Sequence, residues 1–200
     1  MKLPTVGITA LFILVSTPVS RQLVSSVLPS GRSVRVGTPA TAFASVINAG
    51  TETATACSIS PVTDVPGVFL YQTTDPTTNA LTGTTGTPAD IGPNGLQTYM
   101  FAFTPTAPFP PTQIELRFDC TNTEPAEIVP GLNTFSLMAS ETPVPDILAL
   151  AATQSNDGVL HIPPEARAGA FAIATVNLGI AAPVRVVADT QGVELPLELS

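Results

Sequence analysis

The feature that most constrains the fold is a two-residue alternation of apolar and polar side chains. It is clearest over 113–120, where Ile114, Leu116, Phe118 and Cys120 alternate with charged residues. A period of two puts one set of side chains on the buried face of a β-strand and the other set in water. After residue 20 no segment has a convincing helical period, and the chain holds 21 Pro and 14 Gly, which break helices. The sequence therefore predicts an all-β protein.

Turn-forming residues separate the strands that this pattern predicts. The predicted strands are 22–28, 32–36, 40–48, 53–60, 67–73, 96–104, 113–120 and 132–140. Strand 96–104 carries three alternating aromatic residues with Met100 and Ala102 between them, so we expect it to be buried on both faces. Short strands at this spacing predict a β-sandwich with Greek-key pairing.

Residues 73–95 form a long polar segment rich in Thr and Gly. A long loop on a rigid scaffold is a common place for a binding site. The alternative is a solvated connection with a short edge strand near Leu81. Four residues of this segment could offer oxygen ligands to calcium: Asp75, Asn79, Asp90 and Asn94. Their spacing is not that of a calcium-binding loop, and turn formation explains them better.

The two cysteines, Cys57 and Cys120, lie in separate predicted strands. They suit one disulfide in an oxidising compartment, where closure of a loop this long would stabilise the fold by about 4 kcal/mol. The alternative is a pair of buried free thiols, which pack as small apolar side chains. A zinc site would need more ligands than two distant cysteines and the single histidine, His161, supply.

Residues 1–20 have two interpretations. Lys2, a short apolar run over 6–15 and a small-residue end are typical of a secretory signal peptide, and the run is too short for a comfortable membrane span. Residues 7–16 also resemble 131–140. On that second interpretation they are the last strand of an upstream repeat.

An internal repeat predicts how the chain is divided. The segment 42–50, which ends in Asn-Ala-Gly, reappears as 170–179, which ends in Asn-Leu-Gly. We expect a first unit over 21–140, a linker over 141–145 stiffened by two prolines, and an incomplete second unit over 146–200. Because half a sandwich leaves open edges and an uncovered apolar face, we also expect the natural chain to continue beyond Ser200.

Two local predictions concern the second unit. Residues 158–162 match 33–37 in the repeat, and His161, within the run Val-Leu-His-Ile-Pro, is expected to be an ordinary strand residue. The turn Asn156-Asp157-Gly158 is typical of a hairpin.

Charge and motif content exclude several functions. The net charge is −8 and the seven basic residues are scattered, so the patch that nucleic-acid binding requires is missing. Acidity also disfavours anionic membrane surfaces, and we expect no membrane insertion of the mature domain. The chain has no G-x-S-x-G motif, so it lacks the serine nucleophile with which a catalytic histidine at His161 would act. Glu115 and Asp119 lie on the solvent side of one predicted strand, unlike a glycosidase pair. The sequence predicts no catalytic residue, no metal site and no cofactor.

The run 31–50 resembles the opening of immunoglobulin-like repeats of secreted bacterial proteins, and 71–76 and 118–122 resemble later parts of the same repeat. The resemblance implies an immunoglobulin-like sandwich with a structural or adhesive role in a secreted, periplasmic or cell-surface protein. Its partners would be neighbouring repeats or a surface ligand; it specifies no activity. The chain departs from antibody-type domains because it has no Trp and has Phe118 where a tyrosine corner would place Tyr.

The alternative function is an accessory module, binding carbohydrate or protein, of a larger exported enzyme. Carbohydrate platforms usually expose aromatic side chains. The chain has no Trp and only two Tyr, which counts against this alternative.

Overall fold

The computed structural model describes residues 22–154, 160–163, 165–166 and 168–185. This part of the chain is all-β and contains no helix. Its strands are β1 (Leu23–Leu28), β2 (Gly31–Arg35), β3 (Ala40–Asn48), β4 (Ala54–Pro61), β5 (Gly67–Thr74), β6 (Ala89–Ile91), β7 (Leu96–Pro105), β8 (Phe109–Asp119), β9 (Thr134–Ser140), β10 (Ile147–Ala152) and β11 (Ala172–Asn177).

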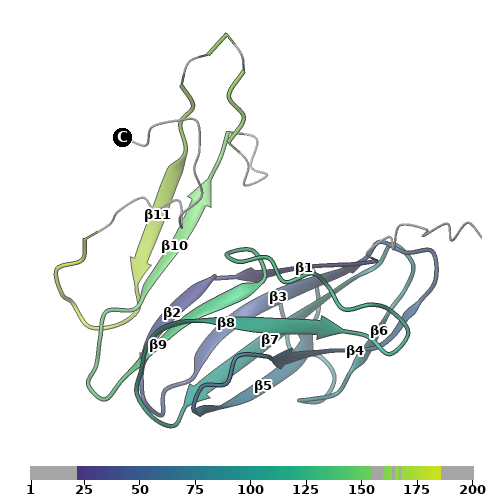
Figure 1. Cartoon of the computed structure of the whole chain (residues 1–200), viewed down its shortest axis with the longest axis horizontal. Coiled ribbons are helices and arrows are strands. Elements are labelled where there is room, and N and C mark those ends of the chain that lie inside the picture. Colours follow the sequence, from purple (N-terminus) through teal and green to yellow (C-terminus); the bar gives the residue numbers. More distant parts are fainter. Residues whose placement is uncertain (1–21, 155–159, 164, 167, 186–200) are drawn as a thin grey trace, which may run out of the picture.

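The first nine strands form two sheets that lie one over the other (Figure 1). One sheet has the order β1-β3-β7-β5 and is antiparallel throughout. The other has the order β2-β9-β8-β4-β6, in which β2 and β9 run parallel and the remaining neighbours antiparallel. The chain leaves the first sheet at the end of β1 and, after two intervening residues, enters the second at β2.

Side chains from the facing sides of both sheets share one apolar core. Phe101 on β7 packs edge-to-face against Phe135 on β9, with ring centroids 5.2 Å apart. The hydroxyl of Tyr99, also on β7, donates to the carbonyl of Cys57 on β4 at 3.3 Å. Burial raises the pKa of Tyr99, and the nearby Tyr71 raises it further. The phenol is therefore neutral at pH 7 and remains a donor across the core.

The strands follow the predicted alternation closely. Ile114, Leu116 and Phe118 are at most 1% exposed, whereas Glu115 and Arg117 between them face solvent. Each predicted strand of the first unit is present, with its ends within a few residues of the expected ones. Two details differ inside the polar segment: β6 was not predicted, and Leu81 makes only an isolated bridge to Thr74 instead of an edge strand.

The prediction that 96–104 is buried on both faces is wrong. Its aromatic residues face the core, but Leu96 on the other side is 47% exposed and Met100 and Ala102 are half-buried. Strand β7 lies inside its sheet, between β3 and β5. In the described part of the chain, no third layer of secondary structure lies over the outer face of this sheet. Apolar residues therefore occur here on both faces of a strand that is covered on only one.

Strands β10 and β11 form an antiparallel hairpin that projects from the two-sheet body beside β2 and β9 (Figure 1). Its pairing reproduces the pairing of β1 with β3. Ile147 lies opposite Asn177 in the same way that Leu23 lies opposite Asn48. The structure thus repeats one register in the two segments that the sequence match relates.

Other predictions for this region fare differently. His161 and its neighbours over 160–162 are not in a strand, so their prediction as a counterpart of 33–37 is wrong at those residues. The turn over 156–158 lies outside the described residues. So do the two interpretations of 1–20 and the expected continuation past Ser200.

Candidate functional site

The disulfide predicted between Cys57 and Cys120 is present, with Cα atoms 4.0 Å apart. It joins β4 to the residue just after β8, one position beyond the last paired residues of those strands, Ser58 and Asp119. The bridge therefore links neighbouring strands of one sheet and not the two layers. Both cysteines are at most 4% exposed. Solvent reductants have little access to a bond buried in this way.

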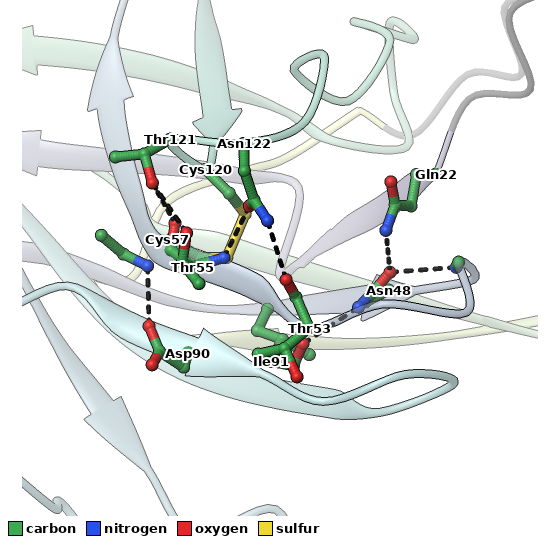
Figure 2. Close-up of a disulfide and its surroundings, with 12 residues drawn as sticks. Gln22, Asn48, Thr53, Thr55, Cys57, Asp90, Ile91, Cys120, Thr121 and Asn122 are labelled. Atoms are coloured by element: carbon green, nitrogen blue, oxygen red, sulfur yellow. Dashed lines mark hydrogen bonds between the residues drawn. A yellow bond between two sulfur atoms is a disulfide. The ribbon is translucent and has the colours of Figure 1, made fainter.

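Hydrogen bonds extend the strand pairing past the disulfide (Figure 2). Asn122 accepts from the backbone N–H of Thr55 at 2.8 Å and donates to the carbonyl of Thr53 at 2.9 Å. The backbone N–H of Thr121 donates to the carbonyl of Thr55 at 2.8 Å. These bonds hold the segment after Cys120 against the start of β4, so the cysteines stay in place independently of the bridge.

A β-bulge lies immediately before Cys57. The pairing of β4 with β6 shifts register between Ala54 and Cys57, and Ala56 has φ 51°. The carboxylate of Asp90 accepts from the N–H of Ala56 at 2.8 Å (Figure 2). A left-handed alanine is unfavourable by itself, and this hydrogen bond helps to hold it. The bulge aims Cys57 into the core beside β8.

Asn48, which is 0% exposed, ties three segments of the chain together at one end of the body. Its amide nitrogen donates to the carbonyls of Glu52, Ile91 and Gly92 at 2.7, 2.9 and 3.0 Å. Its oxygen accepts from the N–H of Gly50 at 2.9 Å and from the side chain of Gln22 (Figure 2). Every polar atom of this buried side chain is satisfied, as the low dielectric of the interior requires.

Asn177 reproduces part of this turn in the hairpin. Its oxygen accepts from the N–H of Gly179 at 2.9 Å, and its amide donates to the carbonyl of Ile180. A Cβ added at Gly179 would lie 2.1 Å from the carbonyl oxygen of Val144. Glycine is therefore required at the third position of this Asn-x-Gly turn by close backbone approach.

Asp146 joins the hairpin to the two-sheet body. Its carboxylate accepts from Nε and Nη2 of Arg32 at 2.9 and 2.7 Å and from the N–H of Ser33 at 2.8 Å. Its own N–H donates to Asn177. The side chains of Arg32 and Asp146 are 12% and 6% exposed. Breaking a buried charge pair that has its full complement of hydrogen bonds is costly, because the remaining charge has no partner.

We expect the substitution Asp146→Asn to lower the free energy of unfolding by about 2 kcal/mol, because it removes the charge from a buried pair with Arg32. The amide nitrogen of the introduced Asn is itself a donor and would face the N–H donors of Arg32 or Ser33. Urea unfolding of the full chain measures the loss, and hydrogen exchange of the β10 and β11 amides should accelerate with it. Asp64→Asn makes the same chemical change at an exposed carboxylate and should shift stability by less than about 0.5 kcal/mol. Equal effects of the two substitutions would contradict the assignment of Asp146 as the joint.

The polar segment after β5 folds back on the free edge of that strand. The N–H groups of Thr82 and Gly86 donate to the carbonyls of Thr73 and Tyr71, both at 2.8 Å. The carboxylate of Asp75 caps the first turn by accepting from the N–H groups of Thr78 and Thr77, and these bonds lower the pKa of Asp75. This arrangement covers an otherwise open sheet edge.

The four oxygen-bearing residues of this segment have separate local roles. Asp75 caps its own turn, Asp90 holds the bulge at Ala56, and Asn79 and Asn94 occupy turn positions with φ 57° and 52°. Within the described ranges no group of three or more acidic, His or Cys residues could hold a metal ion.

The residues weighed for catalysis are not gathered at one place. Glu115 and Asp119 lie on one strand, β8, with Glu115 exposed on its outer side. His161 lies far along the chain in an irregular segment, beside a hollow also lined by Leu160, Pro163 and Phe171.

Among the described residues, no helix is long and apolar enough to cross a membrane.

Sequence reasoning missed Asn48, Asp146 and Arg32, the side chains with the most extensive buried contacts. The Asn-x-Gly turn was visible in the repeat, and it indicated a turn. It could not indicate that the amide would reach carbonyls more than forty residues away. Arg32 and Asp146 are 114 residues apart, and nothing local in either segment predicts their contact.

Comparisons with known proteins give little further information. No protein-family model and no curated protein sequence matches the chain. Among solved structures, similarity is found to a family 123 glycoside hydrolase from Clostridium perfringens, at 7% identity and a TM-score of 0.41. The match covers 60% of this chain and 27% of that structure, so the chain spans about a quarter of it. A likeness at this level carries no argument about activity.

Proposed function

We propose that the chain is a non-enzymatic structural or adhesive module of an exported protein, consisting of an immunoglobulin-like sandwich and a hairpin that repeats its opening strand pair. The observation that carries the proposal is the buried joint at Asp146, which fixes a copy of the β1–β3 pairing to the body of the first unit. A spacer needs rigid contact between successive units. The buried disulfide supports a location in an oxidising compartment.

The strand order supports the immunoglobulin-like part of the proposal. The first two strands of the unit lie in different sheets. Strand β1 pairs with β3, whereas β2 pairs in parallel with β9, the last strand of the unit, in the other sheet. Strands β7 and β8 follow one another in the chain and lie in opposite sheets, so their connection passes between the layers, as connections in Greek-key sandwiches do. One difference is that β6 pairs with β4 yet follows β5 in the chain.

The parallel pair β2–β9 supports a load-bearing role. Tension applied through the two ends of the unit loads β1 first. Once β1 has left β3, it pulls the start of β2 and the end of β9 in opposite directions along the strands. The hydrogen bonds between Gly31–Arg35 and Ser136–Ser140 then resist together, whereas an antiparallel hairpin pulled from its open end loses its bonds one at a time.

Single-molecule pulling of the full chain tests this role. We expect one main rupture event, and we expect Val36→Pro to lower its force by roughly a fifth, since a parallel pair of this length holds about five ladder bonds. The substitution removes the donor of the 2.9 Å bond from Val36 to Ser140 at the end of the pair. Thr87→Pro removes one backbone bond to Thr84 elsewhere and should leave the force unchanged. A low rupture force that both substitutions affect equally would refute the load-bearing role.

The second candidate is the accessory binding module. Exposed Phe43 and Phe171, 42% and 43% exposed, are the aromatic side chains available to stack on a sugar. A glycan array probed with the full chain separates the candidates. Selective binding that Phe43→Ala or Phe171→Ala abolishes would favour the accessory module.

A further inference from the structure

The outer face of the sheet β1-β3-β7-β5 carries many exposed apolar side chains. Seven of them are between 42% and 58% exposed: Val24, Leu28, Phe43, Ile47, Val68, Leu70 and Leu96. Their pairing places them side by side across the sheet. Val24 lies opposite Ile47, and Ile47 lies opposite Leu96 in the next strand. Leu28, Phe43 and Met100 form a second apolar row in the same way, and a row of uncharged hydroxyl side chains, Ser26, Ser45 and Thr98, lies between the two.

The face is also uncharged. The strands β1, β3, β5 and β7 contain no Asp, Glu, Lys or Arg. The opposite sheet differs, because β2 carries two Arg, β6 an Asp and β8 three charged residues. The chain has a net charge of −8, yet this face would meet an identical face without like-charge repulsion at the contact. Monomeric soluble proteins rarely expose contiguous apolar patches larger than a few hundred Å², and larger ones mark interaction sites.

Both edges of this sheet are partly covered by backbone hydrogen bonds. The N–H groups of Thr82 and Gly86 donate to the carbonyls of Thr73 and Tyr71 on β5, so these carbonyls are not available to a partner strand. On the opposite edge, the N–H of Val27 on β1 donates to the carbonyl of Leu132 at 2.8 Å. These contacts disfavour extension of the sheet by a partner strand and leave the face as the surface for association.

The face has the size of a weak interface. Four strands spaced about 4.8 Å apart, paired over about seven residues, span a mean plane of roughly 450 Å², and the relief of the side chains enlarges its accessible area. Stable interfaces bury about 800 Å² on each partner, and transient ones less than about 600 Å². The face therefore suits reversible pairing of two copies and is too small for an obligate dimer.

We propose that two copies of this chain associate through the outer faces of their β1-β3-β7-β5 sheets. Sheets that pack face to face interdigitate side chains like these at a spacing of about 10 Å. The same patch serves both copies, which gives a closed two-fold dimer. The hairpin repeats one element of the patch, since Leu148 lies opposite Val176 as Val24 lies opposite Ile47. Lateral pairing does not depend on the load-bearing role proposed above.

Sedimentation velocity of the full chain over a wide concentration range tests the pairing. We expect reversible dimerisation, and we expect Ile47→Lys to raise the dimer dissociation constant at least about 100-fold, because it buries an unpaired charge from each copy at the contact. Val62→Lys adds the same charge at another exposed apolar residue, 46% exposed and outside this face, and should leave the dissociation constant within about twofold.

Thermal unfolding checks that Ile47→Lys is folded, and Leu96→Lys in the same row replaces it if it is not. A wild-type chain that stays monomeric at its highest soluble concentration would overturn the proposal. So would a dimer that survives the lysine substitutions on the face. Loss of the dimer only with Leu150→Lys, on the hairpin, would place the contact there and overturn it as well.

Discussion

Removing the disulfide should lower the free energy of unfolding by about 4 kcal/mol, the value that chain entropy gives for a separation of 63 residues. Because the bridge joins strands that are already neighbours, we expect the folded structure to survive and the effect to arise in the unfolded chain. Thermal unfolding of Cys57→Ala/Cys120→Ala should show a melting temperature lower by about 15 °C.

Reduction provides the matched control, because it opens the bridge without changing the sequence. The wild-type chain, unfolded and refolded in dithiothreitol, should melt close to the double-alanine variant. In the absence of reductant, peptide mapping should recover the Cys57–Cys120 pair. A reduced chain as stable as the oxidised one would mean that the closed loop does not stabilise the fold.

Replacing Asn48 by alanine should lower the free energy of unfolding by about 3 kcal/mol. The substitution leaves the carbonyls of Glu52, Ile91 and Gly92 without the donor that reaches them, at a site that is fully buried. Asn122→Ala removes an exposed amide that also makes two backbone bonds. Water can replace those bonds, so we expect a loss of at most about 1 kcal/mol. Urea unfolding compares the two.

A second substitution at the same position separates hydrogen bonding from packing. Asn48→Asp keeps the shape but places an oxygen against three carbonyls, so at pH 7 it should be at least as destabilising as alanine. Burial raises the pKa of such a carboxyl in the folded state. The free energy of unfolding of the Asn48→Asp variant is then largest below the unfolded pKa of about 4, and it decreases as the pH rises above that value. If the stability difference between Asn48→Asp and wild type is the same at pH 4 and pH 7, this explanation is wrong.

Local pattern was sufficient to predict the strands of the two-sheet body. The alternation around Leu116 and Phe118 is a direct consequence of one buried and one solvated face, and the structure confirms it. The disulfide was predicted for a related reason, since each cysteine fell at a buried position of a strand. Strand β6 was missed because three residues are too few for a period of two to be visible.

The predictions failed where the answer depended on what covers a surface. The sequence of β7 is apolar at successive positions, which is typical of a strand buried on both sides. Its outer face is nevertheless exposed at Leu96. Likewise, the match of 160–162 to β2 assumed that a strand forms wherever its residues recur, but β2 is held in place by β9. Within the described residues the hairpin has no such neighbour.

The placement of the disulfide also sets how far the chain can lengthen once the unit has ruptured. The bridge closes off the chain between Cys57 and Cys120, a sequence separation of 63, which would otherwise add roughly 210 Å of contour length at about 3.4 Å per residue. Under tension the oxidised chain therefore reaches its full extension early and stiffens. Reduction would release this hidden length, so the redox state of the surroundings would determine the reach of the chain without any change in its folded structure.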